Sequence, residues 1–279
     1  MPNREEQRKG RETAVNAQAA QTAEAAQAAK TIQAAQAALR EKAVAVTGLS
    51  KSYSGKKVIE NLNLTIRPGQ IYGLLGANGA GKSTAVECIL GTRRADSGEV
   101  RILGLDPVTE RRHLFEQVGV QFQEASYPDR IKVRELCEET ACLYEKTADY
   151  RDLLRQFKLE DKADSMLSQL SGGQKQRLFI ILALIPGPKV VFLDELTTGL
   201  DTKSRREVWK CLLEMKDKGL SICLVSHFMD EVEMLCDQIG ILRDGMFVFE
   251  GTVKEAVDNS PYSNLEDAYL WWTQEEENR

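Results

Sequence analysis

A nine-residue glycine-rich run between an apolar strand and a helix constrains the fold of this chain more than any other feature. The strand is predicted at Ile71–Leu75, and the run after it fits the pattern G-x-x-x-x-G-K-[ST] at every position. The run consists of Gly76, Ala77, Asn78, Gly79, Ala80, Gly81, Lys82, Ser83 and Thr84. Glycines adopt backbone angles closed to other residues, so successive N–H groups can curl around an anion. The pattern predicts a phosphate loop, in which Lys82 reaches the β- and γ-phosphates of a nucleoside triphosphate and the Ser83 hydroxyl ligates Mg²⁺.

A second run supplies carboxylates. Residues 189–195 read KVVFLDE, a continuous apolar strand that ends in two acids, as expected of a buried parallel strand. Asp194 would then contribute to the Mg²⁺ shell, and Glu195 would polarise the attacking water. The alternative is a strand followed by a solvated acidic turn, which a neighbouring phosphate loop disfavours.

Composition narrows the class of protein. The chain has 279 residues, of which 42% are hydrophobic, enough for one large α/β domain with a subdomain. The net charge is -5 and the basic pairs are scattered, so nucleic acid is not the expected partner. Six cysteines form no C-x-x-C pair, which argues against zinc and disulfides and fits a reducing cytosol. No signal peptide or membrane-length apolar run occurs, so we expect a soluble, cytoplasmic chain that reaches a membrane only through a partner.

The predicted organisation is an N-terminal extension followed by one domain. Residues 14–42 are rich in Ala and Gln and favour helix, but their nine-residue repeat turns successive units to opposite sides and leaves no apolar seam. We expect residues 1–42 to be a low-complexity helical extension, with a docking helix as the alternative. The ATPase-like domain is expected at 43–279, and its segment at about 128–186 reads as all-helical.

Short strands alternate with helices through the rest of the domain, which predicts a largely parallel sheet with helices on both faces. Further strands are expected at Val44–Tyr53, Lys56–Ile66, Glu99–Leu103, Val118–Phe122, Val190–Leu193, Ser221–Val225 and Gln238–Leu242. Helices are expected at Lys82–Leu90, Val108–Gln117, Lys203–Lys216 and Met229–Leu235. Near the C-terminus four residues at helical spacing, Leu265, Ala268, Tyr269 and Trp272, are expected to pack back on the domain.

The run LSGGQ at Leu170–Gln174, at the start of a predicted helix, is the most restrictive motif. The first N–H groups of a helix lack intrahelical partners and lie at the positive end of the macrodipole, which suits a phosphate. With the phosphate loop and the acidic strand in this order, the chain from about Val44 to Trp272 resembles the nucleotide-binding subunit of ATP-binding cassette (ABC) transporters. The resemblance implies an α/β, P-loop NTPase core with a mostly parallel sheet, an antiparallel β-subdomain and an all-helical subdomain carrying LSGGQ.

The resemblance also implies roles for individual residues. In the family two cassettes pair head to tail, and the signature helix of one caps the ATP held by the other. The residues expected to bind the partner's γ-phosphate are Ser171, Gly172, Gly173 and Gln174. Tyr53 matches the aromatic that stacks on adenine, with an exposed turn tyrosine as the alternative, and His227 matches the switch histidine. Gln123 matches the glutamine that senses Mg²⁺ and the attacking water, while Gln121 is expected to pair locally. Asp201 corresponds to the D-loop and would face across the dimer.

Two positions depart from the family pattern. Leu196 follows Glu195 where the family usually has proline, and Thr202 follows Asp201 where proline is common. Both changes are expected to loosen the loop after the acidic strand. Neither removes a phosphate-binding or catalytic group, so ATP binding and hydrolysis are expected to remain.

The partners implied by the resemblance are an integral membrane permease and a second cassette, expected to be an identical copy. ATP and Mg²⁺ are the implied cofactors, and the implied location is the inner face of the cell membrane. Several stretches look like the exporter branch that handles drugs, antibiotics or surface glycans, and Phe122, Tyr127 and Tyr144 are candidates for the permease groove. A cytosolic ABC-type ATPase without a transport role stays open as the alternative. A P-loop kinase or GTPase is disfavoured, because LSGGQ and His227 would then have no role.

Overall fold

The computed structural model describes residues 42–122 and 127–273. The strands are β1 (Val44–Tyr53), β2 (Lys56–Ile66), β3 (Ile71–Gly76), β4 (Ser97–Ile102), β5 (Val118–Gln121), β6 (Val190–Asp194), β7 (Ser221–Val225), β8 (Gln238–Arg243) and β9 (Met246–Gly251). The α-helices are α2 (Lys82–Ile89), α3 (Arg111–Phe115), α4 (Val133–Ala141), α5 (Tyr150–Gln156), α6 (Gly172–Leu184), α7 (Thr202–Asp217), α8 (Met229–Leu235), α9 (Val253–Asp258) and α10 (Leu265–Thr273). Two short 3₁₀ turns, η1 (Glu160–Lys162) and η2 (Leu167–Gln169), precede α6. Nearly all of the predicted extension at 1–42 lies outside the described residues, so the domain boundary stays a prediction.

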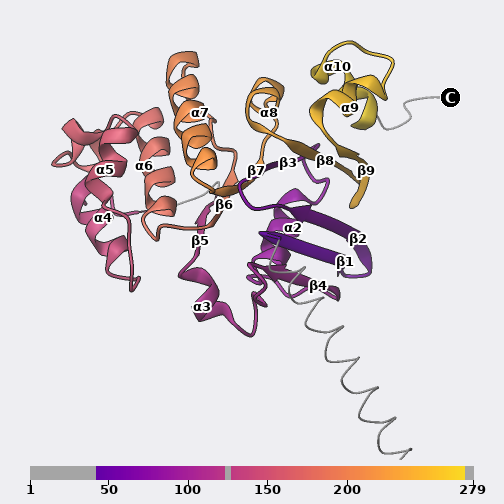
Figure 1. Ribbon diagram of the computed structural model, residues 1–279, viewed down its shortest axis with the longest axis horizontal. Helices are drawn as coiled ribbons and strands as arrows, with labels where there is room; N and C mark the ends of the chain where they lie inside the picture. Colours follow the sequence, from indigo (N-terminus) through magenta and orange to yellow (C-terminus); the bar gives the residue numbers. More distant parts are fainter. Residues whose placement is uncertain (1–41, 123–126, 274–279) are drawn as a thin grey trace, which may run out of the picture. The chain divides into compact units, whose positions relative to one another are not determined.

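The larger sheet confirms the mostly parallel core. Its strand order is β5-β6-β7-β3-β8-β9, and every neighbouring pair is parallel except β8 and β9. The carboxyl ends of parallel strands share one edge of a sheet, which is where ligands bind in such folds. Three neighbouring strands therefore deliver their following loops to the same edge: β6 leads to Glu195, β7 leads to His227, and β3 leads to the phosphate loop (Figure 1).

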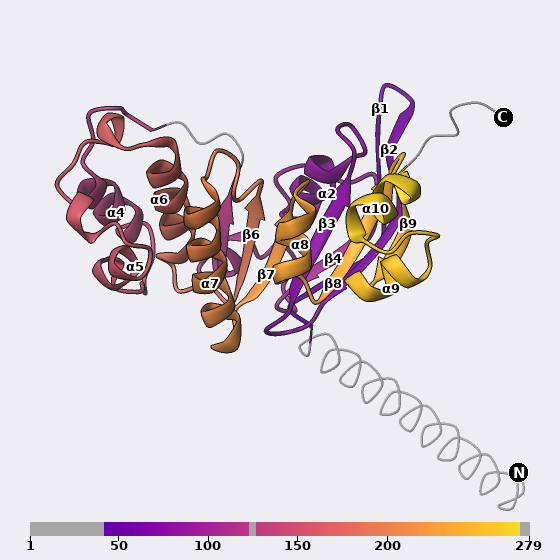
Figure 2. The ribbon, with the colours of Figure 1, turned by 90° about the horizontal axis from the view of Figure 1, so that it is seen from above.

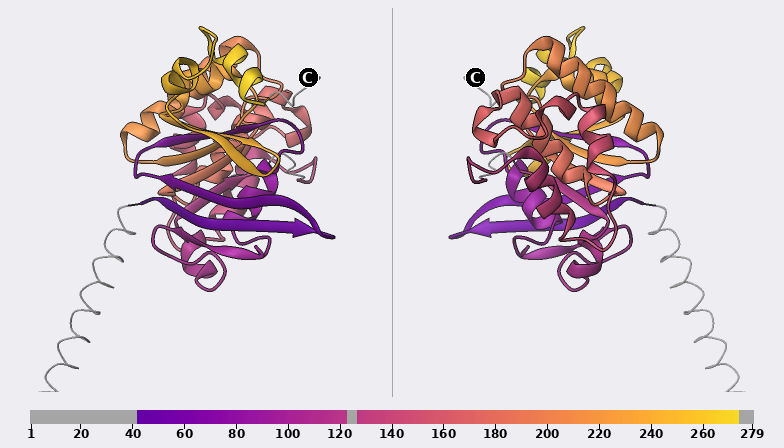
Figure 3. Two further views of the ribbon diagram at one scale, coloured as in Figure 1. Left: turned by 90° about the vertical axis from the view of Figure 1, so that its right-hand side faces the viewer. Right: turned by 90° about the vertical axis from the view of Figure 1, so that its left-hand side faces the viewer.

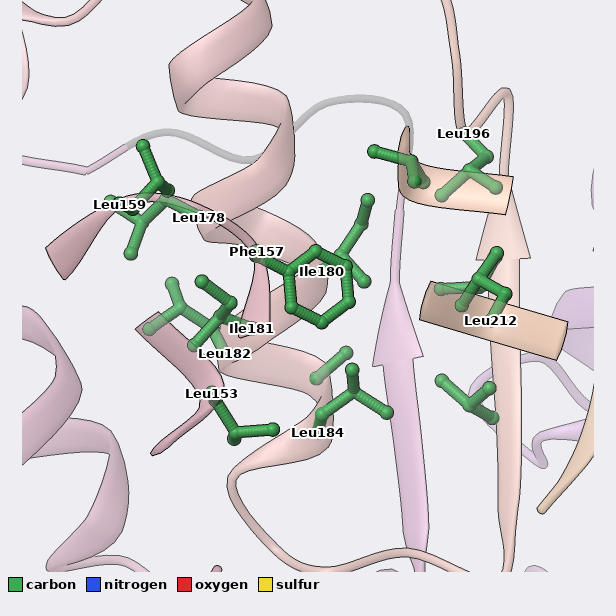
Figure 4. Packing of buried hydrophobic residues seen from close by; sticks show 14 of the residues in the cluster. Leu153, Phe157, Leu159, Leu178, Ile180, Ile181, Leu182, Leu184, Leu196 and Leu212 are labelled. Atoms are coloured by element: carbon green, nitrogen blue, oxygen red, sulfur yellow. The ribbon is translucent and has the colours of Figure 1, made fainter. Parts of the chain in front are cut away.

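The side chains of the buried strands alternate between the two faces of this sheet, and each face has its own hydrophobic cluster. Val191 and Leu193 of β6 pack with α4–α7, in the cluster that Figure 4 shows from close by. Val190 and Phe192 of the same strand belong to the cluster that contains α2 and the smaller sheet. Successive side chains of a strand point to opposite faces, so one apolar strand builds both halves of the core.

The smaller sheet is antiparallel, with strand order β2-β1-β4, and this confirms the expected antiparallel subdomain. It packs with α2 through buried residues such as Leu49, Leu64 and Ile89. In Figure 3 its indigo strands lie on the α2 side of the larger sheet. The smaller sheet therefore supports the helix that begins at the phosphate loop.

The helices α4, α5 and α6 gather beside β5 and α7 (Figures 1 and 2) and fall within the segment predicted to be all-helical. At the other end of the sheet, α10 packs on β8, β9 and α9. Leu265 and Ala268 are fully buried there, and the indole Nε1 of Trp272 donates to the carbonyl oxygen of Ala256 at 3.0 Å. The expectation that this segment packs back on the domain is confirmed. No helix in the two described ranges is both long and apolar enough to cross a membrane.

One expectation about local structure was wrong, and two elements were not predicted. The helix expected at Val108–Gln117 is confined to α3, because the carboxylate of Asp106 accepts hydrogen bonds from the N–H groups of Val108 and Thr109, both at 2.9 Å, and holds a turn there. The strand β9 and the helix α9 were not expected at all. Strand β9 pairs antiparallel with β8 through a turn at Asp244 and Gly245, both of which have positive φ.

Candidate nucleotide-binding site

The phosphate loop connects β3 to α2 and is held by its own lysine. The Nζ atom of Lys82 donates to the carbonyl oxygens of Gly76 at 2.7 Å and Ala77 at 3.0 Å. Gly81 has φ 108°, and a Cβ atom there would lie 2.7 Å from the Val58 carbonyl oxygen, so only glycine fits. The residues of the run that are exposed are Ala77, Asn78, Gly79 and Ser83, whereas Gly76, Ala80 and Gly81 are buried and Lys82 and Thr84 are half-buried. The loop therefore presents its tip and the start of α2 to solvent.

Carboxylates and a lysine share the edge of the sheet beside this loop. Burial lowers the pKa of Lys82, while the charges of Asp194 and Glu195 oppose the shift. Burial and the neighbouring Glu195 raise the pKa of Asp194 to about 6, and Lys82 opposes that shift. Two neighbouring carboxylates with one ammonium group leave an excess of negative charge that favours a further cation.

Glu195 lies where β6 ends and has an unusual backbone conformation. Its φ is 50°, in the left-handed region that non-glycine residues seldom adopt. Hydrogen bonds hold it there: its N–H donates to the carbonyl oxygen of Val225 at 2.9 Å, and its own carbonyl oxygen accepts from Gln176 Nε2 at 3.4 Å. The Nδ1 atom of His227 lies 3.5 Å from Glu195 Oε1. The structure thus brings the ends of β6 and β7 together as the sequence predicts.

The residues near Lys82 fit a magnesium ion bound with phosphate. Mg²⁺ prefers hydroxyl and carboxylate oxygens and takes few protein ligands when phosphate supplies the others. The exposed hydroxyl-bearing Ser83 follows the lysine at the start of α2, and Asp194 provides a carboxylate whose pKa is raised by burial and by the neighbouring Glu195. The donor set and its charge both suit a hard divalent cation.

The signature run begins α6, and its serine caps the helix. The Ser171 hydroxyl accepts from the N–H of Gln174 at 3.2 Å, and the Gln174 side chain accepts from the N–H of Ser171 at 2.9 Å. Ser171 and Gly172 are exposed, and a Cβ atom built at Gly172 would meet nothing within 4 Å. The start of α6 is therefore accessible to solvent at Ser171 and Gly172.

Asp201 caps the next helix. Its carboxylate accepts from the N–H groups of Lys203 and Ser204, each at 3.0 Å, and from the Ser204 hydroxyl at 2.6 Å, which lowers its pKa. Leu196, the residue that replaces the usual proline, is fully buried in the core that Figure 4 shows. The segment between β6 and α7 is therefore anchored at both ends, and the loosening expected from the sequence is not what these contacts indicate.

Of the predicted site residues, Tyr53 lies apart from this cluster and Gln123 lies outside the described residues. Tyr53 ends β1 with 37% of its surface exposed, and its ring is approached by the cationic groups of Lys51 and Arg93 at 5.3 and 5.4 Å. Gln123 lies outside the described residues, so its role stays a prediction. The local pairing expected of Gln121 is confirmed, because its Nε2 donates to the Phe122 carbonyl oxygen at 2.9 Å.

The sequence did not indicate two neighbours of the site. Gln176 supports the backbone of Glu195, and Arg93 lies against Tyr53 while its side chain pairs with Glu87 at 2.6 Å. Gln176 follows the signature run, and its helical position could have suggested a contact on the inner face of α6. The sequence positions of Arg93 and Tyr53 do not indicate that the two side chains meet, because β1 and the end of α2 are far apart in the chain.

Comparisons with known proteins agree with this geometry. The family model described as ABC transporter matches residues 59–198. Over 217 residues the chain is 37% identical to the Nod factor export ATP-binding protein I of Burkholderia thailandensis, an alignment that covers 76% of this chain and 71% of that protein.

Solved structures show the same fold. The structure of an ATP-binding subunit of an ABC transporter superposes with a TM-score of 0.76 at 26% identity, covering 83% of this chain and 99% of that chain. A dimeric, post-hydrolysis ATP-binding cassette bound to ADP and Pi superposes with a TM-score of 0.67 at 23% identity, covering 75% of this chain and 98% of that one. The motifs, the fold and the relatives agree, and this chain belongs to the ABC transporter family, as an ATP-binding and ATP-hydrolysing subunit that powers transport.

Proposed function

We propose that this chain is the ATPase of an exporter, that it works as a pair of identical cassettes, and that it acts on a separate permease at the inner face of the cell membrane. One observation carries the pairing: the catalytic groups lie together near Lys82 of the phosphate loop, while the signature helix of the same chain begins at the exposed Ser171 and Gly172. A second chain would bring its signature run to this loop and complete the site.

The functional groups of one chain would have different roles in binding and hydrolysing ATP. The loop N–H groups and Lys82 hold the β- and γ-phosphates. Glu195 accepts a hydrogen bond from the attacking water and polarises it, and His227, 3.5 Å from Glu195, contacts the γ-phosphate. Tyr53 stacks on adenine, and Gln123 contacts the water and the metal ion. Catalysis of this kind depends mainly on positioning and on stabilising charge at the γ-phosphoryl group.

Ser83, Asp194 and Gln123 would hold Mg²⁺. When bound, the ion supplies positive charge beside the phosphate oxygens and relieves the crowding of Asp194 and Glu195. The partner's Ser171, Gly172, Gly173 and Gln174 would contact the γ-phosphate from the opposite side. Asp201 would lie near the boundary between the two chains, since it precedes the exposed start of α7.

The direction of transport is supported by the relative from Burkholderia thailandensis, whose name includes export. A permease groove is supported by aromatic side chains that are not fully buried. Phe122 is 42% exposed, and Tyr127, half-buried, has its ring 5.3 Å from that of Phe179 in α6. Tyr144 is half-buried near Tyr127, and burial raises the pKa of both phenols.

Affinity purification from detergent-solubilised membranes tests the proposal. The tagged Glu195→Gln chain is purified with ATP and Mg²⁺, because slow hydrolysis should preserve the closed pair, and the co-purifying proteins are identified by mass. We expect a polytopic membrane protein in stoichiometric amount. A purely soluble assembly would contradict the transport role and favour a cytosolic ABC-type ATPase, the alternative function. Accumulation assays in cells lacking the chain then test direction, since loss of an exporter raises the internal level of its substrate.

A further inference from the structure

The most buried acidic side chain of the described residues is Glu231, in the first turn of α8, and its exposed fraction is 0%. Both of its carboxylate oxygens accept hydrogen bonds. Oε1 accepts from Trp209 Nε1 at 3.1 Å, and Oε2 accepts from the Ser226 hydroxyl at 2.6 Å. A buried carboxylate is costly unless such donors surround it, so these bonds define where the surrounding segments can lie.

Glu231 joins helix α7 to the end of β7, and the end of β7 leads to His227. Ser226 directly precedes His227, and its hydroxyl oxygen also accepts from the N–H of Phe228 at 3.1 Å. The backbone on both sides of His227 is therefore tied to one hydroxyl group, which in turn donates to Glu231. Burial raises the pKa of Glu231, and the hydrogen bonds from Ser226 and Trp209 oppose that shift. The hydroxyl of Thr197, two residues after Glu195, is also buried and has no hydrogen-bond partner in the described structure.

Helix α7 holds the same segment at a second point. Arg205 Nη1 donates to Asp230 Oδ2 at 2.8 Å, and its guanidinium lies 4.8 Å from the centre of the Phe228 ring. Arg205 and Trp209 are one helical turn apart, so both lie on the face of α7 that meets α8. The helices α7 and α8 lie side by side in Figures 1 and 2. The segment from Ser226 to Glu231 is thus held against α7 by hydrogen bonds and a ring contact, and Asp201 caps the first turn of α7.

We propose that Glu231 is a positioning residue for ATP hydrolysis, which holds His227 in place beside Glu195 by joining the end of β7 to helix α7. The proposal rests on the roles given above to Glu195 and His227. It adds a group that touches neither nucleotide nor water, and it makes the geometry of the site depend on a buried carboxylate on α8.

Glu231→Gln is the informative substitution, because an amide of the same shape has one acceptor oxygen where the carboxylate has two. The amide cannot accept from both Trp209 and Ser226, and its NH₂ group must face one of these donors. We expect kcat for ATP to fall by about ten- to a hundredfold, as for a small displacement of a reacting group. The KM for ATP should stay within about twofold, because no described contact of Glu231 involves the phosphate loop.

A second substitution distinguishes an effect on the position of His227 from a general loss of the folded structure. In Trp209→Phe the donor to Oε1 is gone, so a glutamine at 231 can turn its NH₂ group toward the phenyl ring and keep its oxygen toward Ser226. The double variant Glu231→Gln with Trp209→Phe should therefore hydrolyse ATP faster than Glu231→Gln alone. Glu233→Gln, an exposed site on the same helix, is the matched control and should behave as the wild-type chain does.

The measurements are kcat, KM and melting temperature of the full-length chain, with Glu195→Gln in the same series. Wild-type turnover of Glu195→Gln would show that the proposed function is wrong in its site roles. If Glu195→Gln is inactive but Glu231→Gln turns over normally, only the positioning inference is overturned. The inference also fails if Glu231→Gln lowers the melting temperature, raises KM as much as it lowers kcat, and gains nothing from Trp209→Phe.

Discussion

Two helices of this chain begin at glycine-rich runs, and the surroundings of the two runs differ. Before α2, Gly76 and Gly81 are buried, and a Cβ atom at Gly76 would lie 2.5 Å from the Leu242 carbonyl oxygen. Before α6, Ser171 and Gly172 are exposed, and Gly172 has nothing within 4 Å of a Cβ position. The first run is packed against its own domain, whereas the second faces outward.

The glycines therefore serve different purposes. At the phosphate loop, glycine is required by the close approach of backbone and by a left-handed φ of 108° at Gly81. At the signature run, the absence of a side chain at Gly172 leaves space on the surface of the chain, whereas a Cβ atom at Gly173 would lie 3.0 Å from Leu200. The first half of the composite site is built with its carboxylates in place, and the second half is complete only when another chain approaches. Substitutions in the two halves can show whether both act on the same nucleotide.

The largest effect is expected for Glu195→Gln, which removes the group proposed to polarise water. ATPase activity should fall by about 10²- to 10⁴-fold, the usual contribution of general base catalysis, while ATP binding remains. Turnover is measured by phosphate release, and the ATP-stabilised pair by sedimentation. The exposed Glu139→Gln is the control. A pair that forms equally without ATP would contradict the composite site.

Ser171→Arg should lower turnover without weakening the binding of ATP. The added side chain would fill the outward-facing half, so turnover should fall by about a hundredfold or more, while the affinity for ATP measured by titration stays within about twofold. Thr147→Arg adds the same charge at an exposed position of the helical segment and should leave both quantities unchanged. If Ser171→Arg abolished nucleotide binding, the signature run would belong to the site of its own chain.

Tyr53→Ala should have the opposite effect, weaker binding of ATP with little change in turnover. Loss of stacking on the base should weaken ATP binding by about three- to tenfold and leave kcat at saturating ATP nearly unchanged. The cations of Lys51 and Arg93 near this ring would remain. Tyr262→Ala is the control, because Tyr262 is comparably exposed, at 43%. Equal affinity in Tyr53→Ala and wild type would return Tyr53 to the alternative of an exposed turn residue.

Asp194→Asn should stabilise the nucleotide-free chain. The folded-state pKa of about 6 lies above the ordinary value of 3.8, so ionisation of Asp194 opposes folding. Its contribution to stability is present below about pH 4 and is lost as the pH rises through about 6. At pH 7.5 the variant should gain about 1 to 2 kcal/mol in the free energy of unfolding, allowing for solvent screening.

Urea denaturation at pH 7.5 and pH 5 measures this gain, which should be smaller at pH 5. Asp129→Asn, at an exposed position, should change little at either pH. A loss of stability in Asp194→Asn, or a gain that does not depend on pH, would contradict the conclusion that the ionised carboxylate of Asp194 destabilises the nucleotide-free fold.

Regular elements of this fold could be predicted from the sequence where apolar runs were long. The bounds of β7 agree with those expected, since a buried parallel strand reads as an apolar run between turn signals, and the bounds of β1, β2 and α8 agree as well. The strand β9 was missed because Met246–Gly251 is only partly buried and carries no strong alternation. Long-range pairing with β8, rather than local sequence, determines that segment.

The candidate site was predictable as a set of motifs but not as a geometry. The glycine pattern and the acidic strand indicate chemistry because phosphate and metal ions need particular groups at fixed spacing. The left-handed φ of Glu195 and the contact of Arg93 with Tyr53 depend on tertiary structure, and no local pattern encodes them. The same is true of Glu231, which reads as one acid among several in HFMDEVE and is fully buried.

The central claim is that one site is built from two chains, and mixing two inactive variants tests it directly. Lys82→Ala damages the phosphate loop and Ser171→Arg damages the signature run, so a mixed pair retains one intact composite site. We predict that neither variant hydrolyses ATP alone and that a mixture regains activity, highest near equal amounts. Absence of recovery at every ratio, with mixed pairs verified by differential tagging, would contradict the composite site.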